Sequence, residues 1–199
     1  MKKKLQELRN RINKFMFFCR MKKIKFNIGS SGINSGDDWF ATDIDTLDIT
    51  KYENWRRHLF FLRLDNIIAE HVWEHLTDTD TQLANKNCFR VLKKKGVLRI
   101  AVPDGFHPDK NYIEYVKPGG NGAGAEDHKI LYTYKTMKDR LEKVGFTVNL
   151  LEYWDEQGKF HFTDWSDEGG RIRRSKRYDH RNNDGKLNYT SLIVDAVKP

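Results

Sequence analysis

The most constraining feature of this sequence is a pair of strand-like runs between residues 24 and 48. Ile24 to Ile28 (IKFNI) is apolar and leads directly into a small-residue turn, GSSG, at residues 29–32. A second run, Trp39 to Ile44, places the carboxylate of Asp43 near its end. A glycine turn after one strand and an acid after the next are typical of a nucleotide-type cofactor site. Taken alone, GSSG is equally consistent with a structural turn.

Strand and helix patterns alternate along the rest of the chain. A helix is expected after Thr77 or Asp78, which can cap its N-terminus, and Lys93 to Gly96 are expected to end it. A second helix is expected after Thr133, ending at Gly145. Strand-like runs follow or precede these helices at Asn66–Glu70, Val97–Val102, Phe146–Leu150 and Leu192–Val197. This alternation predicts an α/β sheet with parallel strands.

Two long polar segments, 105–127 and 153–188, interrupt the pattern and are expected to be substrate-side insertions. Loops of this length in a compact domain are often functional. The second contains the basic run GGRIRRSKRYDHRNNDG. It can be a solvated loop, or a clamp for the phosphate of a nucleotide-linked or lipid-linked sugar, because arginine binds phosphate bidentately. RNA binding would use the same charges together with stacking aromatics.

The first 22 residues are expected to form a basic amphipathic helix. Its apolar stripe either packs on the domain or lies on a membrane surface. The stripe consists of Leu5, Leu8, Ile12, Phe15 and Cys19 and is widened by Met16, Phe17 and Phe18. The chain has 199 residues, a net charge of +8 and two cysteines far apart. These totals favour one medium domain in a reducing cytoplasm, with no disulfide framework and no membrane span.

In their order along the chain and in their residues, these motifs resemble those of class I S-adenosylmethionine-dependent methyltransferases. The segments that carry the resemblance are FNIGSSG, WFATDID, LDI, DNIIAEHVWEHL, FRVLKKKGVLRIAVPD and EKVGF. More narrowly, they look like a group of small bacterial predicted methyltransferases associated with surface-polysaccharide genes. The resemblance covers about residues 23–199, which it identifies as the methyltransferase domain. It implies a Rossmann-like sheet, mostly parallel with an antiparallel C-terminal strand, and helices on both faces.

The resemblance also implies S-adenosylmethionine as the cofactor. In it, Gly29 and Gly32 border the methionine and ribose portions, Asp43 holds the ribose hydroxyls, and Asp48 with the backbone of Ile49 meets adenine. The full set of cofactor-binding residues that it implies is Asn27, Gly29, Ser30, Gly32, Asp43, Ile44, Asp48, Ile49 and Glu70. The sequence departs from the family at Ser31, where a glycine is usual. It also leaves only ten residues, 29–38, for the first connection between strands.

Methyl transfer to a hydroxyl needs a general base, and histidine is the usual candidate near neutral pH. His71 and His128 are the predicted catalytic residues. The predicted substrate-binding residues are His75, Asp104, Tyr132, Arg171 and Arg174, although His75 is as readily a structural residue. No metal is predicted, because HVWEH has Val72 where the zinc motif HExxH has glutamate.

The sequence therefore predicts a cytoplasmic or membrane-associated methyltransferase that acts on a small-molecule or glycan-type acceptor, in surface-polysaccharide biosynthesis. An RNA methyltransferase and a non-catalytic binding protein with the same fold are the alternatives. An NAD-dependent oxidoreductase is disfavoured, because GSSG lacks the three-glycine dinucleotide fingerprint. Nucleic acid is a less favoured partner, residues 1–20 are the candidate membrane contact, and the sequence does not define the oligomeric state.

Overall fold

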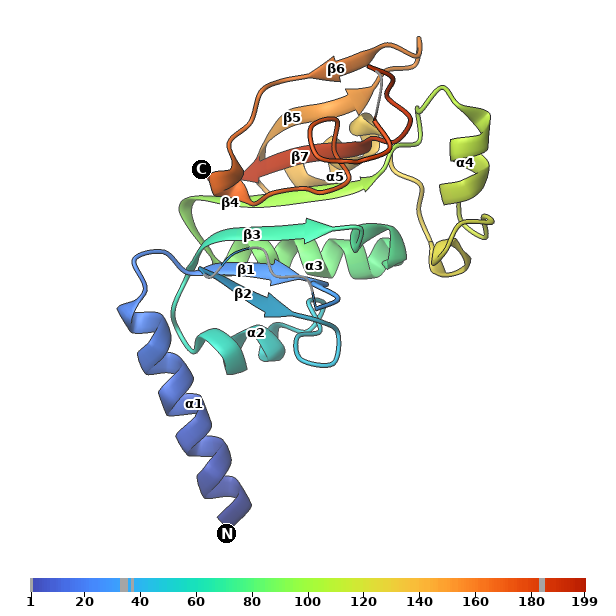
Figure 1. Cartoon of the computed structure of the whole chain (residues 1–199). Coiled ribbons are helices and arrows are strands. Elements are labelled where there is room, and N and C mark those ends of the chain that lie inside the picture. Colours follow the sequence, from blue (N-terminus) through green and yellow to red (C-terminus); the bar gives the residue numbers. More distant parts are fainter. Residues whose placement is uncertain (1, 33–35, 37, 183–184) are drawn as a thin grey trace.

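The computed structural model of the protein describes residues 2–32, 36, 38–182 and 185–199. Seven strands in these ranges form one sheet in the order β2-β1-β3-β4-β7-β5-β6 (Figure 1). The strands are β1 (Lys25–Ile28), β2 (Trp39–Thr42), β3 (Leu64–Glu70), β4 (Leu92–Pro103), β5 (Thr147–Trp154), β6 (Phe160–Phe162) and β7 (Ser191–Val197).

Strands β2, β1, β3 and β4 are parallel neighbours. The C-terminal strand β7 runs antiparallel between β4 and β5, and β6 is antiparallel to β5. Five strands therefore point the same way and two point back. This is the predicted Rossmann-like sheet, mostly parallel with an antiparallel C-terminal strand. The short strand β6 was not predicted.

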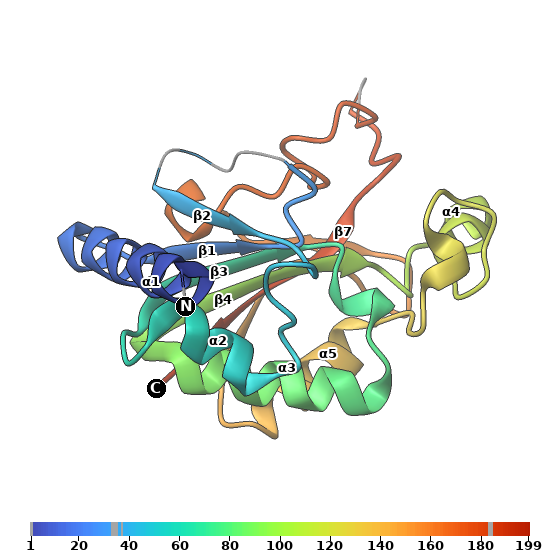
Figure 2. The ribbon, with the colours of Figure 1, turned by 90° about the horizontal axis from the view of Figure 1, so that it is seen from below.

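The α-helices are α1 (Lys2–Arg20), α2 (Tyr52–Leu59), α3 (Asp78–Val91), α4 (Lys110–Val116) and α5 (Tyr134–Glu142). Three short 3-10 helices add η1 (Trp73–His75), η2 (Ala125–Asp127) and η3 (Asp167–Gly169). Helices α2, α3 and α5 cover one face of the sheet (Figure 2). Their apolar side chains Trp55, Cys88 and Met137 join Phe26 and Ile100 of the strands in the main core.

The second face of the sheet is covered by extended chain and the 3-10 helix η3. Ile68 and Ala101 on this face pack with Trp165 and Ile172 from the 153–188 segment. Arg99, 2 % exposed, fixes this cover. Its guanidinium binds the carboxylate of Asp195 at 2.7 and 2.8 Å and donates to the carbonyl oxygens of residues 166 and 170. Helices were expected on both faces of the sheet, but α-helices cover only the first face in the described part of the chain.

The predicted helix starts are correct. The Thr77 side chain accepts the amide of Asp80 at the start of α3, and Thr133 forms a capping box at the start of α5. The predicted end of α3 is wrong, because the helix stops at Val91 and Lys93–Gly96 belong to β4. Leu92 pairs with Leu64 of β3, so strand pairing overrides the local helix pattern at this point.

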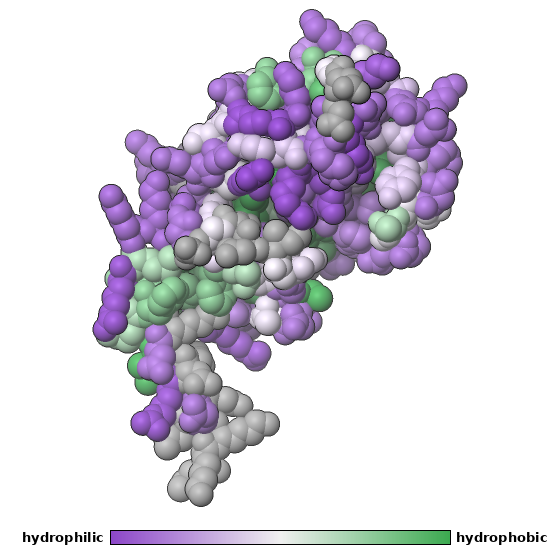
Figure 3. Space-filling model, viewed as in Figure 1, coloured by the Kyte–Doolittle hydropathy of each residue, from purple (hydrophilic) through white to green (hydrophobic). Residues whose placement is uncertain are grey.

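Helix α1 projects from the body of the protein, and its last turn anchors it (Figure 1). The anchor is Phe18, 1 % exposed, which contacts Phe26 and Phe40. Packing of the stripe on the domain, one of its two predicted roles, is correct at Phe18 but not at Cys19, which is exposed, or at Ile12, which is 49 % exposed. The side chains of Leu5 and Leu8 lie outside the described residues. Figure 3 shows hydrophobic side chains gathered where this helix meets the sheet. No helix of the described residues is long and apolar enough to cross a membrane.

Candidate functional site

Two cavities open next to each other beyond the carboxyl ends of the parallel strands. The first, of about 420 Å³, is called the Asp43 cavity after the acid that lines it. The second, of about 470 Å³, is called the Arg174 cavity. Both are lined by Gly29, Ser31, His71 and His75. In an open α/β sheet this edge is where ligands bind, and here two ligands can reach a common wall.

The Asp43 cavity is built from the two turns that follow β1 and β2. The Ser30 hydroxyl donates to Oδ2 of Asp43 at 2.9 Å, and the amide of Ser31 donates to Oδ1 at 3.0 Å. These bonds hold the GSSG turn against the carboxylate, which still has lone pairs for further donors. The apolar part of the wall comes from Ile28, Leu47, Ile49, Val72 and Leu76. One end of the cavity is therefore acidic and the remainder largely apolar.

Gly29 forms the floor between the two cavities and cannot carry a side chain there. Its φ is +62°, a left-handed conformation that favours glycine. A Cβ at this position would lie 2.4 Å from Cγ2 of Val72. The backbone of the first turn is thus kept open toward a ligand, as predicted for a cofactor turn.

Asp48 lies in the Asp43 cavity, but its carboxylate is already engaged. Its Oδ1 accepts the amide and the hydroxyl of Thr50, at 3.0 and 2.6 Å, and Oδ2 lies 2.8 Å from Nζ of Lys51. Burial raises the pKa of Asp48, yet these partners hold it below its ordinary value. The carboxylate therefore shapes the turn that places Ile49 in the cavity wall.

His71 stands on the wall that the two cavities share. It follows β3 with a φ of +57°, which is uncommon for a residue other than glycine and is often found at functional sites. Its Nδ1 lies 3.0 Å from Oε1 of Glu74, and its Nε2 lies 3.0 Å from the Ser191 hydroxyl. The ring is therefore fixed at both nitrogens within the site.

Glu74 lies in the site but is not among the residues predicted from the sequence. It lines the Arg174 cavity from η1 yet is only 1 % exposed. Neither carboxylate oxygen has a hydrogen-bond partner among the described residues. The His71 ring, 3.0 Å from Oε1, is therefore the nearest group that can balance the negative charge of Glu74. Burial has the largest influence and raises its pKa, but the interactions with His71 and His75 and a backbone contact together outweigh burial and hold the pKa below its ordinary value. The i,i+3 spacing of His71 and Glu74 was the available signal.

His75 and His128 meet in the Arg174 cavity, although they are far apart in the sequence. Their ring centroids lie 4.8 Å apart in a T-shaped contact. Nδ1 of His75 lies 3.2 Å from Oδ2 of Asp127, and Nδ1 of His128 lies 2.7 Å from the carbonyl oxygen of Val116. One ligand atom from each histidine and one from Glu74 lie within 4.8 Å of one another. The structure thus forms a possible metal-ligand set where none was predicted.

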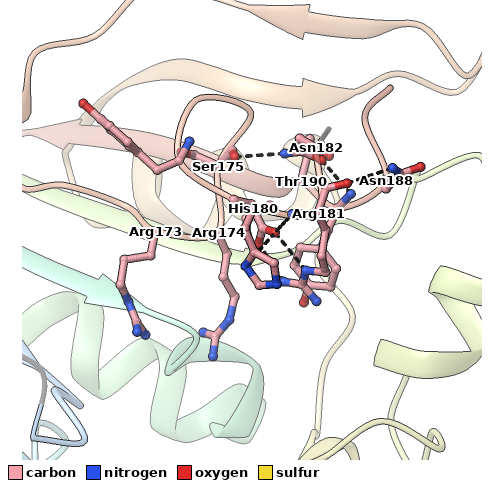
Figure 4. A network of polar contacts seen from close by, with 12 residues as sticks. Arg173, Arg174, Ser175, His180, Arg181, Asn182, Asn188 and Thr190 are labelled. Atoms are coloured by element: carbon pink, nitrogen blue, oxygen red, sulfur yellow. Dashed lines mark hydrogen bonds and ion pairs between the residues drawn. The ribbon is translucent and has the colours of Figure 1, made fainter. Parts of the chain in front are cut away.

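Three arginines of the basic run, Arg173, Arg174 and Arg181, line the Arg174 cavity (Figure 4). The loop that carries the first two is held by Glu70, whose carboxylate accepts their backbone amides at 3.0 Å each. Their guanidinium groups stay 3.7 and 3.6 Å from the same carboxylate. Arg181 forms a two-point contact with Asp179 and lies over the Tyr189 ring at 3.5 Å. The cavity is therefore strongly cationic along this side.

Several predicted cofactor residues occupy other positions. Glu70 lines the Arg174 cavity instead of the Asp43 cavity and holds the arginine loop. Asn27 and Ser30 are buried and line neither cavity, and Gly32 lies outside both linings. Gly29, Asp43, Ile44, Asp48 and Ile49 do line the Asp43 cavity.

Three predicted substrate residues lie elsewhere. Tyr132 and Asp104 are 0 % exposed. The Tyr132 hydroxyl pairs with Thr81 in the core at 2.9 Å, and Asp104 accepts the amides of residues 106 and 154. Burial raises the pKa of Asp104 to about 6, although these amides oppose the shift. Arg171 stacks on Tyr178, with its guanidinium 4.0 Å from the ring centre and outside the cavity. Of the predicted substrate residues, His75 and Arg174 line the Arg174 cavity.

No family model and no curated protein matches this sequence. Solved structures do match. A SAM-dependent methyltransferase of Thermotoga maritima, described as a possible histamine N-methyltransferase, is 12 % identical with a TM-score of 0.50, and the match covers 95 % of this chain and 89 % of that one. PigF with SAH is 9 % identical with a TM-score of 0.50, over 89 % of this chain and 50 % of that one.

A SAM-dependent methyltransferase from Archaeoglobus fulgidus is 17 % identical with a TM-score of 0.49, over 98 % of this chain and 94 % of that one. At these identities the likeness concerns the fold. The chain has the Rossmann-like fold of SAM-dependent methyltransferases.

Proposed function

We propose that the protein is an S-adenosylmethionine-dependent methyltransferase whose acceptor is an anionic small molecule or glycan. The observation that carries this proposal is the pair of adjoining cavities with a common wall at Gly29 and His71. A transferase must bring donor and acceptor into contact, and alignment of the two supplies much of the rate. A binding protein needs only one of these cavities.

The residues of the Asp43 cavity fit the cofactor. Asp43 keeps acceptor capacity for vicinal hydroxyls after its bonds to Ser30 and Ser31. The side chains of Leu47 and Ile49 offer apolar surface to a purine, and the missing side chain at Gly29 admits the ligand to the backbone. When bound, S-adenosylmethionine supplies an electrophilic methyl group on a sulfonium.

His71 is the proposed general base. Nδ1 of its ring lies 3.0 Å from Oε1 of Glu74, so the negative charge of the carboxylate favours the ring proton at Nδ1 and leaves the lone pair at Nε2. Nε2 now faces the Ser191 hydroxyl, and an acceptor hydroxyl in the Arg174 cavity can take that place. As the acceptor oxygen gains its methyl group, its proton passes to Nε2 of His71. His128, the other predicted catalytic residue, would contact the acceptor from across the cavity.

The arginines support an anionic acceptor. Arg173, Arg174 and Arg181 face one cavity, and guanidinium groups bind phosphate and carboxylate bidentately. A sugar phosphate, a nucleotide-linked sugar or an acidic glycan has the matching chemistry. Together with the sequence resemblance, this supports a role in surface-polysaccharide biosynthesis over a role on RNA.

Calorimetric titration with S-adenosylmethionine and with NAD tests the cofactor. We expect S-adenosylmethionine alone to bind, and Asp43→Asn to weaken it by about 10- to 100-fold, the loss expected for hydrogen bonds to a charged group. Asp45→Asn is the matched control, because Asp45 is exposed and lines neither cavity. Absence of S-adenosylmethionine binding to the folded wild-type protein would refute the proposal.

A transfer assay with labelled cofactor tests the acceptor. Nucleotide-linked sugars, sugar phosphates and unstructured RNA are offered separately, and incorporation into the sugar compounds is expected. Incorporation into RNA alone, with a steep dependence on salt, would instead establish the RNA alternative.

A further inference from the structure

We propose that Glu74, His75 and His128 bind a divalent transition-metal ion inside the Arg174 cavity. One ligand atom of each side chain lies within 4.8 Å of the other two. Two imidazoles and one carboxylate are a ligand set that holds Zn²⁺ and related ions while leaving coordination positions open. Neither the cofactor nor the proposed base requires this grouping.

The state of the Glu74 carboxylate is the first argument for a cation. An ionised carboxylate in the protein interior is costly unless a charge or hydrogen bonds compensate it. Glu74 is 1 % exposed, and neither oxygen has a hydrogen-bond partner among the described residues. Oε1 has the neighbouring His71 ring at 3.0 Å, which leaves the other oxygen without any such contact. A cation in the cavity would compensate this oxygen.

The orientation of the two histidines is the second argument. A carbonyl oxygen cannot donate a hydrogen bond, so Nδ1 of His128 must carry the proton in its contact with Val116. Nδ1 of His75 faces Oδ2 of Asp127 at 3.2 Å in the same way, with the carboxylate oxygen as the acceptor. Each neutral ring therefore presents an unprotonated Nε2. Metal-binding histidines are oriented in this way by a carboxylate or carbonyl partner.

The spacing of the ligands fits a site that closes slightly around its ion. Zinc ligands lie about 2.0–2.2 Å from the ion, which places ligand atoms about 3–4 Å apart. A separation of up to 4.8 Å requires a closure of about 1 Å. His75, with a side chain 33 % exposed, stands where the cavity opens and gives the ion access.

A bound ion would act on the acceptor. Its open positions would face the cavity that we assign to the acceptor, where a Lewis acid lowers the pKa of a hydroxyl group. This role rests on the proposed methyltransferase function, whereas binding of the ion does not. Nitrogen ligands favour Zn²⁺ over Mg²⁺, which prefers oxygen ligands and retains its waters.

Titration of the chelator-treated full-length protein with Zn²⁺, and separately with Mg²⁺, tests the site. We expect one Zn²⁺ per chain, no Mg²⁺ binding under the same conditions, and a Zn²⁺-dependent rise in Tm. His128→Gln should weaken Zn²⁺ binding by more than about 100-fold, and Asp127→Asn by about 10- to 100-fold, the loss expected when the hydrogen-bond partner of a metal-binding histidine is removed. His161→Gln is the matched control, because His161 forms a similar pair with Asp155 at 2.7 Å outside the cavity.

The variants also separate this inference from the proposed function. Equal Zn²⁺ affinity of the wild type and His128→Gln, or loss of Zn²⁺ binding in His161→Gln, would overturn the site. Glu74→Gln adds a test within the interior, with Tm measured to verify that the variant folds. S-adenosylmethionine affinity is measured on the same samples without metal. Failure of cofactor binding with intact Zn²⁺ binding refutes only the methyltransferase proposal, and the converse refutes only the metal site.

Discussion

The two cavities share a wall but are constructed in different ways. Apart from Val72, Leu76 and the residues of the shared wall, nearly all of the Asp43 cavity comes from one stretch of chain, residues 28–50. The Arg174 cavity is assembled from β3 and η1, the segment around α4, His128, the arginine loop and Tyr189. The first has largely apolar walls around three carboxylates, those of Asp43, Asp48 and Asp127. The second collects arginines and histidines around the buried carboxylate of Glu74.

This difference is consistent with a division of labour. A site formed by consecutive strand ends and tight turns has its geometry set by the sheet itself. A site formed by loops that cross the sheet edge can change its ligand by changing the loops. We infer that the Asp43 cavity holds the constant donor and that the Arg174 cavity determines the acceptor. The two should then respond separately to substitution, except at their common wall.

The largest effect is expected at the common wall, at His71. In His71→Gln the side chain can still hydrogen-bond but cannot accept a proton, so turnover should fall by about 100- to 10,000-fold, the contribution of a general base. Steady-state turnover and calorimetric S-adenosylmethionine binding measure the two properties, and because His71 lines both cavities, we expect a change in binding that is much smaller than the change in turnover. His161→Gln serves as the control. Full turnover in His71→Gln would remove the proposed base.

A substitution at Gly29 tests how tightly the common wall is packed. In Gly29→Ala, the left-handed backbone and a contact of 2.4 Å with Val72 combine, and we expect a loss of about 2–4 kcal/mol in the free energy of unfolding. Gly32→Ala is the matched control. Its φ is +75° but no atom lies within 4 Å of the added Cβ, so about 1–2 kcal/mol is expected. Urea denaturation measures both, and equal losses would show that the contact with Val72 does not matter.

The same contrast explains how far the sequence could be interpreted. Gly29 and Asp43 were predictable because each follows a strand within a few residues, so local pattern and site position coincide. Glu74 was not assigned to the site, and Arg173 and Arg181 were predicted only as members of a basic run that could be a phosphate clamp or a solvated loop, because only tertiary structure brings η1 and the arginine loop together. The helix end placed at Lys93–Gly96 failed for a related reason, since pairing with β3 decided the backbone there. Three-residue β6 carries too little periodicity to detect.

Arg174 tests the acceptor side alone. Removing one guanidinium from the cationic wall in Arg174→Ala should weaken an anionic acceptor by about 10- to 100-fold, as for a charge-assisted hydrogen bond. S-adenosylmethionine affinity should not change, because Arg174 does not line the Asp43 cavity. Arg171→Ala is the control, since Arg171 stacks on Tyr178 outside both cavities. Acceptor KM and cofactor Kd are the measurements. A parallel change in both constants would contradict the separation of the two cavities.

The smallest effect concerns pH, beside the Arg174 cavity. Burial lowers the pKa of His107 to about 4, although Asp109 opposes this, and Nε2 of His107 has no hydrogen-bond partner in the described part of the chain. The folded state thus binds fewer protons at His107 than the unfolded state does between about pH 4 and 6.5. The contribution of His107 to the free energy of unfolding therefore decreases as the pH falls across this window. His107→Phe keeps the stacking on Tyr112 at 3.9 Å and removes the titration.

Asp104 shifts stability the opposite way in the same window, because its folded pKa is raised to about 6 and its folded state binds the additional proton. Wild-type stability should therefore change little between pH 6.5 and 4 through these two groups. In His107→Phe, Asp104 is the only one of these two groups that still changes stability with pH. Its free energy of unfolding should rise on acidification relative to wild type by about 1–2 kcal/mol, after allowance for solvent screening. Urea denaturation at pH 6.5 and pH 4.5 measures the difference, and parallel pH profiles would show that His107 is not held neutral by burial.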